Sequence, residues 1–322
     1  METFGIVCVV CERKASRRTA LKTGKILLPL ILACLLTFMT GCTVENTGDI
    51  SKHNVAGITI AVSIMPEKAF VEAVCIGIPG IEVLVAIPPG YSPENYEPSP
   101  KHIRDLSSAD IYFTIGVRAE EYSILPALKE EGGPMVVSLR DAAASGYEEI
   151  EISPGERDPH IWLSPQRAGA MVKAIGEELS KIDTLNSSKY SENMAKYLNE
   201  LEELHNYLQS LFREAGSRDF IVFHPAYGYL ASDYGLVMHS LEQEGKEATA
   251  MHLSEMVDLA LEKGITTIFY QAEADSRQSV SFAEEISGTA VKLDPLSVDY
   301  IDNLKTMAKL ITGGKQEAGT PK

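Results

Sequence analysis

Apolar residues along this chain follow two alternating patterns. Short runs rich in β-branched residues occur at 58–64 (ITIAVSI), 81–87, 110–116 and 134–139, and a second set follows at 219–224, 235–240, 266–271 and 289–294. Runs of this length, bounded by Pro, Gly or Asp, are typical of buried strands. Helical stretches separate most of them, and strands that alternate with helices indicate parallel sheets. We therefore predict an α/β protein with two Rossmann-like lobes, each built on a parallel sheet.

A long amphipathic stretch lies between the two sets of strands. Its apolar residues recur at spacings of three and four, which places them on one face of a helix: Tyr190, Met194, Tyr197, Leu201, Leu204, Leu208 and Leu211. Ser187 or Ser188 can cap its start and Gly216 can end it. We predict a single helix over 187–216 that links the lobes. Its apolar face is expected to pack against them in a monomer, and a coiled-coil dimer seam is the alternative.

The first 42 residues differ in kind from the rest. Six basic residues precede or open an apolar run over 26–39, and the segment ends in Met39-Thr40-Gly41-Cys42. The run is short for crossing a bilayer, which needs about 20 apolar residues, so an export signal fits better. The ending resembles a lipobox, with Met39 where that motif usually has Leu. The resemblance implies that Cys42 is lipidated and anchors the protein to the outer face of the cytoplasmic membrane; an ordinary signal peptide or an uncleaved anchor is the alternative.

Charge narrows the range of partners. After residue 42 the chain carries 23 of its 29 basic and 43 of its 45 acidic residues, a net charge of −20. This excess of acid argues against nucleic acid and favours attraction of cations. Cys75 is the only cysteine after Cys42, so no disulfide can form within the mature part. The predicted organisation is a signal peptide (1–42), a polar tether (43–56), an N-terminal lobe (57–186), the linking helix (187–216), a C-terminal lobe (217–315) and a tail (316–322).

Metal-competent side chains cluster at predicted strand ends. His224 follows the strand FIVF, Asp294 follows VKL, and the loop PPGYSPENYEPSP over 88–100 follows the second strand. The stretch DPHIWLSP, which contains His160 and the chain's single tryptophan, lies just before a predicted helix over 166–179. Ligands of open α/β sheets bind beyond the carboxyl ends of the strands. We therefore expect these side chains to face one cleft.

The order of these motifs resembles the zinc and manganese substrate-binding proteins of ABC importers, the cluster of ZnuA-type proteins. The resemblance rests on PPG-x-x-P-x-x-YEP, DPH-x-W-L-x-P, FH-x-AYGYLA-x-x-YGL and LDPL, and extends from Ile58 to about Leu310. It implies two α/β lobes joined by one long helix, with a metal in the cleft between them. It also implies a membrane permease and an ATPase as partners.

The resemblance implies four metal ligands in this chain. It matches the second and third ligands to His160 and His224 and the acidic fourth ligand to Asp294. The first ligand departs from the pattern, because Glu94 stands where members usually have His. A carboxylate can replace an imidazole at zinc, although a solvated Glu94 with water in its place is the alternative, and Asp294 could instead cap the turn that follows it. Two carboxylates shift the balance toward manganese, so we expect zinc, with manganese as the alternative.

Other functions would need features that the sequence does not show. HExxH, GxSxG and the P-loop motif are absent, which leaves an enzyme without a recognisable catalytic motif. A metal-dependent hydrolase or a surface adhesin on the same fold remains the alternative to metal capture for transport. Some zinc-type members carry a histidine-rich loop before the DPH motif, whereas this chain reads GYEEIEISPGERDPH, which we expect to be a solvated acidic loop.

Overall fold

The computed structural model describes residues 57–313, apart from 131–132, 154, 243–247 and 274–276. The predicted signal with Cys42, the tether over 43–56 and the tail over 316–322 lie outside the described residues. Asn54–Lys322 belong to one compact unit. Within the described part of the chain, no helix combines the length and the hydrophobicity that a membrane crossing requires.

The N-terminal lobe is built on a parallel sheet with the strand order β2-β1-β3-β4. Its strands are β1 (Ile58–Val62), β2 (Ile81–Val85), β3 (Ile111–Thr114) and β4 (Met135–Ser138). Its helices are α1 (Met65–Val74), α2 (Pro100–Ser107), α3 (Leu125–Glu130) and α4 (Leu139–Ala144). A π-helical turn over Glu120–Ile124 precedes α3. The central strands β1 and β3 are rich in fully buried apolar residues, as expected for a parallel sheet covered on both faces.

The C-terminal lobe repeats this plan with the order β10-β9-β7-β8, again all parallel. Its strands are β7 (Asp219–Val222), β8 (Val237–Ser240), β9 (Thr267–Gln271) and β10 (Thr289–Leu293), and its helices are α7 (Gly228–Tyr234), α8 (Ala250–Lys263), α9 (Arg277–Glu285) and α10 (Tyr300–Ile311). Gly235 and Gly264 end α7 and α8 with φ values of 65° and 68°, a left-handed conformation that favours glycine. All eight predicted strands are present, and the predicted fold class is confirmed.

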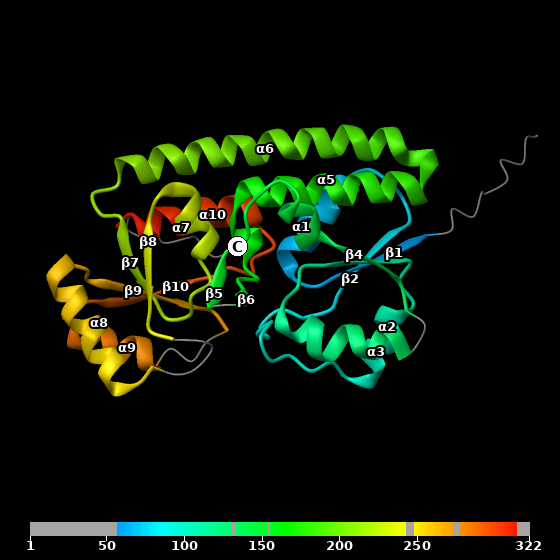
Figure 1. Ribbon diagram of the computed structural model, residues 1–322. Helices are drawn as coiled ribbons and strands as arrows, with labels where there is room; N and C mark the ends of the chain where they lie inside the picture. Colours follow the sequence, from blue (N-terminus) through cyan, green and yellow to red (C-terminus); the bar gives the residue numbers. More distant parts are fainter. Residues whose placement is uncertain (1–56, 131–132, 154, 243–247, 274–276, 314–322) are drawn as a thin grey trace, which may run out of the picture. The chain divides into compact units, whose positions relative to one another are not determined.

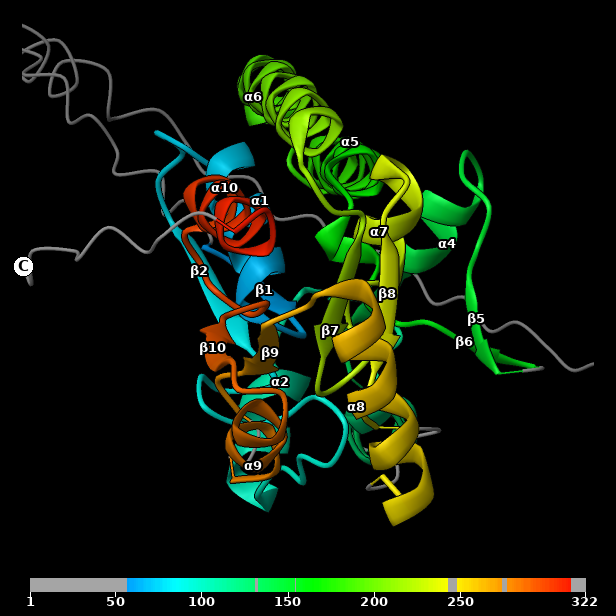
Figure 2. The same ribbon diagram turned by 90° about the vertical axis from the view of Figure 1, so that its left-hand side faces the viewer.

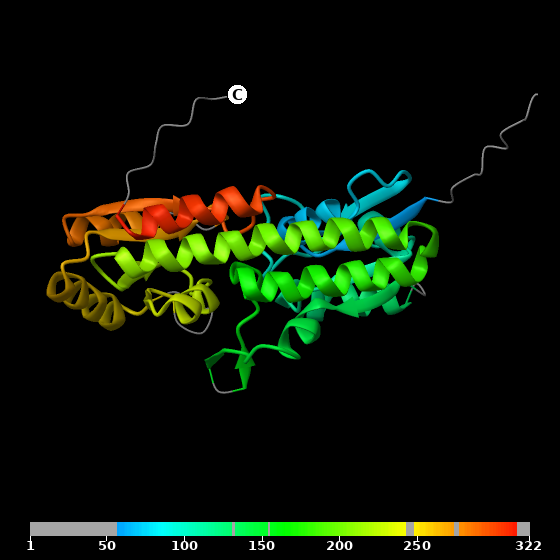
Figure 3. The same cartoon turned by 90° about the horizontal axis from the view of Figure 1, so that it is seen from above.

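Two long helices, α5 (Pro165–Ile182) and α6 (Ser187–Glu214), lie side by side on the same face of the molecule, and α6 extends over both lobes whereas α5 lies over the N-terminal lobe (Figures 1 and 3). Helix α5 packs along α6, and α6 also contacts α1 of the first lobe and α7 and α10 of the second. The linking helix therefore ends two residues earlier than predicted, and Asn186 precedes it without a side-chain cap. Its buried side chains include four of the predicted stripe, with two additions: Tyr190, Asn193, Leu201, Leu204, Leu208 and Phe212. The chain's own helices thus cover the apolar face.

A small hairpin replaces the loop expected before the DPH motif. Strands β5 (Glu151–Ser153) and β6 (Glu156–Arg157) pair antiparallel, and Gly155 in the turn has a φ of 83°. The hairpin projects from the body of the lobes (Figure 2). The segment is solvated as expected, since Glu151, Gly155, Glu156 and Arg157 are exposed. It forms a hairpin and not a loop, because the alternating residues Glu149 to Ile152 also have the pattern of a strand.

The tryptophan of the DPH motif joins the region before α5 to the C-terminal lobe. Trp162 is 1% exposed, and its Nε1–H donates to the carbonyl oxygen of Pro295 at 2.8 Å. In return, the hydroxyl of Tyr300 donates to the carbonyl oxygen of Trp162 at 2.6 Å. The Tyr300 ring packs edge-on against Phe70 of α1, with centroids 4.8 Å apart. Two hydrogen bonds and a ring contact therefore hold these segments together inside the core.

Replacing Tyr300 with Phe should lower the free energy of unfolding by about 1–3 kcal/mol, because a buried carbonyl loses its donor. The matched control is Tyr122→Phe, the same chemical change at a side chain that is 72% exposed. Urea denaturation of both variants measures the difference. Equal free energies of unfolding for the two variants would contradict a stabilising role for the Tyr300–Trp162 hydrogen bond.

Candidate metal centre

His160 is held by an acidic residue two positions before it. It lies between β6 and a 3₁₀ turn over Ile161–Leu163, and it is 5% exposed. Oδ1 of Asp158 accepts hydrogen bonds from the backbone N–H of His160 at 2.9 Å and from its Nδ1 at 2.7 Å. Aspartate side chains commonly bond to the backbone two residues on. Both the ring and the backbone of His160 are therefore fixed by a single buried carboxylate.

His224 is held in the same manner in the other lobe. It follows β7 at the carboxyl edge of the second sheet, and its Nδ1 lies 2.5 Å from Oε2 of Glu242. Glu242 follows β8, the neighbouring strand, and its backbone N–H donates to the carbonyl of Phe223 at 2.9 Å. The parallel pairing of β7 with β8 thus brings the carboxylate to the imidazole.

The two imidazoles face each other across the lobes. Nε2 of His160 lies 3.3 Å from Nε2 of His224, and the ring centroids are 5.1 Å apart. In a neutral imidazole whose Nδ1–H donates to a carboxylate, Nε2 carries the lone pair that can bond a metal. Nitrogen bonds zinc at about 2.0–2.1 Å, so two nitrogens of a tetrahedral site lie about 3.3–3.4 Å apart. The pair therefore has the spacing that a shared metal ion requires.

Glu94 supplies an oxygen beside this pair. One ligand atom each of Glu94, His160 and His224 lies within 4.8 Å of the others. Glu94 belongs to the loop after β2, and its backbone N–H donates to the hydroxyl of Ser92 at 3.3 Å. The backbone N–H of Ala119 holds the same loop through the carbonyl of Pro93 at 2.9 Å. The structure therefore brings three of the four expected ligands together, from two lobes.

Asp294 lies outside this group. Its Oδ1 accepts the backbone N–H of Leu296 at 3.1 Å, as a turn cap does. It lines a separate cavity of about 240 Å³ together with Glu273 and with Gly90 of the Glu94 loop. Burial raises the pKa of the Glu273 carboxyl, and the neighbouring charge of Asp294 adds to the increase. Cys42, the expected lipidation site, lies outside the described residues.

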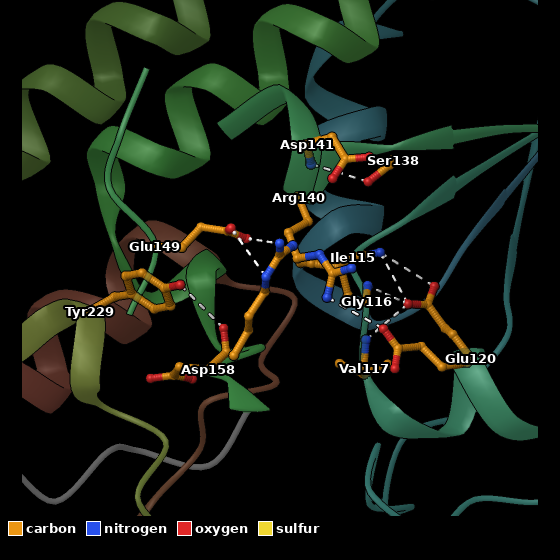
Figure 4. Close-up of polar contacts among 12 residues, drawn as sticks. Ile115, Gly116, Val117, Glu120, Ser138, Arg140, Asp141, Glu149, Asp158 and Tyr229 are labelled. Carbon is orange, nitrogen blue, oxygen red and sulfur yellow. Dashed lines mark hydrogen bonds and ion pairs between the residues drawn. The ribbon is translucent and has the colours of Figure 1, made fainter. Parts of the chain in front are cut away.

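The three clustered residues line a larger cavity of about 470 Å³. The hairpin contributes Ile152, Gly155, Glu156 and Arg157 to it, and the segment after β3 contributes Gly116, Arg118, Glu121 and Tyr122. Figure 4 shows Arg140, another lining residue, extending toward Gly116. The candidate metal site therefore opens into a space much larger than one ion.

Two supporting carboxylates were not assigned from the sequence. Asp158 is part of the DPH motif, and its position two residues before a candidate ligand was a usable signal. The sequence signal for Glu242 was weaker: it follows a predicted strand at the edge of the sheet where His224 lies. Histidines without a motif bond elsewhere in the described structure: His102 to Ala86, His205 to Tyr234, His239 to Asp219 and His252 to Ser240.

Comparison with known proteins gives a family match over most of the chain. The family described as "Zinc-uptake complex component A periplasmic" matches residues 60–314. A relative, the high-affinity zinc uptake system protein ZnuA of Bacillus subtilis (strain 168), is 26% identical over 302 residues, which cover 86% of this chain and 93% of that protein.

Solved structures show the same arrangement. A crystal structure of ZnuA has a TM-score of 0.75 and 34% identity, and the match covers 80% of this chain and 99% of that one. A ZnuA deletion mutant with zinc bound has a TM-score of 0.74 and 35% identity, over 81% of this chain and all of that one. The similarity therefore includes both lobes and the long helices.

Replacing Glu242 with Gln should weaken zinc binding by about 10–100-fold, because a carboxylate that holds a ligand imidazole sets both its orientation and its basicity. Glu203→Gln, the same change at an exposed position of α6, is the matched control. Competitive titration with a chromophoric chelator measures both affinities. If the two variants bind zinc equally well, Glu242 does not support the site.

Proposed function

Because this chain belongs to the family of zinc-uptake complex component A, we propose that it captures a divalent transition metal outside the cytoplasm and delivers it to an ABC importer. Zinc is the proposed cargo, with manganese as the alternative. The named relatives support zinc, since one belongs to a zinc uptake system and one was solved with zinc bound. The permease and the ATPase of the importer are the proposed partners.

The observation that carries this proposal is the facing pair of Nε2 atoms, 3.3 Å apart. When both rings are neutral, two lone pairs at this distance repel each other, and a metal ion bonded to both removes the repulsion. A carboxylate holds each ring from behind, the arrangement that metal-ligating histidines commonly have. The side chains of His160 and His224 are only 6% and 14% exposed, and both line the cavity of about 470 Å³ through which an ion can enter. We propose that a metal ion occupies the position between the two nitrogens, and the match to the zinc-uptake family supports this choice.

We propose that Glu94, His160 and His224 are the protein ligands that bind the metal first, before Asp294. Glu94 adds one negative charge, which partly neutralises a divalent ion in a poorly solvated site. Asp294 is the proposed fourth ligand by resemblance, and it would have to leave the Leu296 turn and approach the imidazoles as the lobes close. Ligands drawn from two lobes also suit a carrier, because separating the lobes dismantles the site and releases the ion.

To capture a metal and deliver it to an importer, the protein must lie on the outer side of the cytoplasmic membrane. We propose that residues 1–42 direct export and that a lipid on Cys42 anchors the mature protein, a monomer, to the membrane beside the importer. The support is the basic and apolar pattern of the segment and its lipobox-like end. A carrier has no need of a catalytic base, and we propose no enzymatic role.

Alanine in place of His160 or His224 should lower zinc affinity more than about 100-fold, because removal of a ligand exceeds the loss of a supporting group. His205→Ala is the control, since His205 lies on α6 and bonds Tyr234 instead. Isothermal titration of metal-stripped protein gives the three affinities. Unchanged affinity in either ligand variant would refute the site.

Changing Glu94 to His should move the preference toward zinc, because imidazole is the softer donor and manganese gains most from oxygen. Glu94→Gln should instead weaken both metals by at least about tenfold, manganese more than zinc. Glu97→Gln is a matched control at an exposed position three residues away. Zinc-to-manganese affinity ratios that are the same in the wild type and in both Glu94 variants would show that Glu94 is not a ligand.

A further inference from the structure

Part of the cavity beside the candidate ligands is lined by side chains that do not bind a cation. Three arginines, Arg118, Arg140 and Arg157, line it together with Glu94 and the two histidines. Guanidinium groups stay protonated throughout the physiological pH range. Glu94, Glu121 and Glu156 line the same cavity, so the three positive charges are balanced by carboxylates, one of which is a candidate metal ligand.

The three arginines differ in how many of their N–H groups already form hydrogen bonds. Arg157 forms a fork with Glu149, through Nε at 3.3 Å and Nη1 at 3.4 Å. Arg140 reaches Glu121 only through Nη1 at 3.4 Å, and its Nε is buried without a hydrogen-bond partner among the described residues. Arg118 is exposed, and its guanidinium lies over the ring of Tyr122 at 5.4 Å. Nε of Arg140 is therefore enclosed by protein atoms, whereas its Nη2 is not enclosed and forms no hydrogen bond among the described residues, which leaves a donor for an acceptor in the cavity.

The position of Arg140 is set by the segment after β3. A Cβ atom on Gly116 would lie 2.7–3.0 Å from atoms of the guanidinium, so the glycine is what lets the group rest against the backbone. Buried Glu120 fixes this backbone, since its Oε2 accepts N–H groups of Ile115 at 3.1 Å, Gly116 at 2.6 Å and Val117 at 3.0 Å (Figure 4). The guanidinium is thus held in one position, as recognition of a carboxylate or a phosphate requires.

The size of the cavity and the number of candidate metal ligands both leave room for a second bound molecule. A cavity of about 470 Å³ falls in the range of roughly 300–1,000 Å³ that small-molecule sites occupy. Glu94, His160 and His224 supply three donors, whereas zinc usually takes four. With Asp294 bonded to Leu296, an oxygen from a bound molecule can complete the set.

We propose that the cavity binds the metal together with a small oxyanion, a carboxylate or a phosphate, which bridges the ion and the guanidinium of Arg140. One anion oxygen coordinates the metal and another accepts from Arg140 Nη2, with Arg118 near the cavity mouth. The proposal rests on the metal-binding function proposed above. It makes the cargo a metal with its anion, and it explains why arginines line a site for cations.

The test uses the cobalt(II)-loaded protein, because the visible absorption of cobalt changes when a ligand enters its coordination sphere. Inorganic phosphate and acetate are titrated separately into the wild type. We expect a saturable spectral change with at least one of them, and the stronger response distinguishes a phosphate site from a carboxylate site. At an anion concentration ten times its dissociation constant, apparent zinc affinity should rise about 11-fold by linkage.

Arg140→Gln should raise the anion dissociation constant about tenfold or more, as loss of a charge-assisted hydrogen bond does, while metal binding without anion persists. The matched control is Arg213→Gln, at an exposed position of α6, which should respond to the anions as the wild type does. Circular dichroism checks that both variants fold.

Three outcomes overturn the proposal in distinguishable ways. Metal binding with no response to either anion refutes the anion site but leaves the metal function intact. If a response appears only in Asp294→Asn, the carboxylate of Asp294 holds the fourth position in the wild type and no anion is needed. Absence of both zinc and cobalt binding refutes the proposed function itself, and the anion site with it.

Discussion

Two imidazole nitrogens that face each other at 3.3 Å are the constraint on which the rest of this structure depends. Each ring could turn its other nitrogen inward, and the carboxylates of Asp158 and Glu242 prevent this by binding Nδ1. One carboxylate is local and the other comes from a neighbouring strand. The protein therefore builds the same arrangement twice, by a turn in one lobe and by sheet pairing in the other.

The meeting of the two rings also requires that the segments carrying them keep their places. His160 lies two residues before Trp162, whose ring is 5.2 Å away and whose indole N–H is bonded to Pro295 of the second lobe. The hydroxyl of Tyr300 bonds the Trp162 backbone in turn. The single tryptophan thus anchors the neighbouring histidine, so that one short motif contributes both to the core and to the candidate metal site.

The fold was predictable to a large extent because β-branched runs and a 28-residue amphipathic helix are local patterns. The candidate site was predictable in part. Strand ends identify the edge at which His224 and Asp294 lie, but an edge does not give distances, and Asp294 is bonded to Leu296 apart from the imidazoles. Glu242 depends on the pairing of β7 with β8, which no single segment reveals. The role of Arg140 depends on a contact with Gly116 that only the folded chain makes.

Charge acts at two ranges in this protein. The net charge of −20 after residue 42 attracts cations of every kind, but salt screens it within about 10 Å. The cavity itself is lined by three glutamates and three arginines, so its own side chains give no net attraction for a cation. Under the proposed function, selection would therefore come from the donors at short range, the two fixed nitrogens and the carboxylate of Glu94. A cation that bonds only oxygen would gain one of these three donors, whereas one that also bonds nitrogen would gain all three.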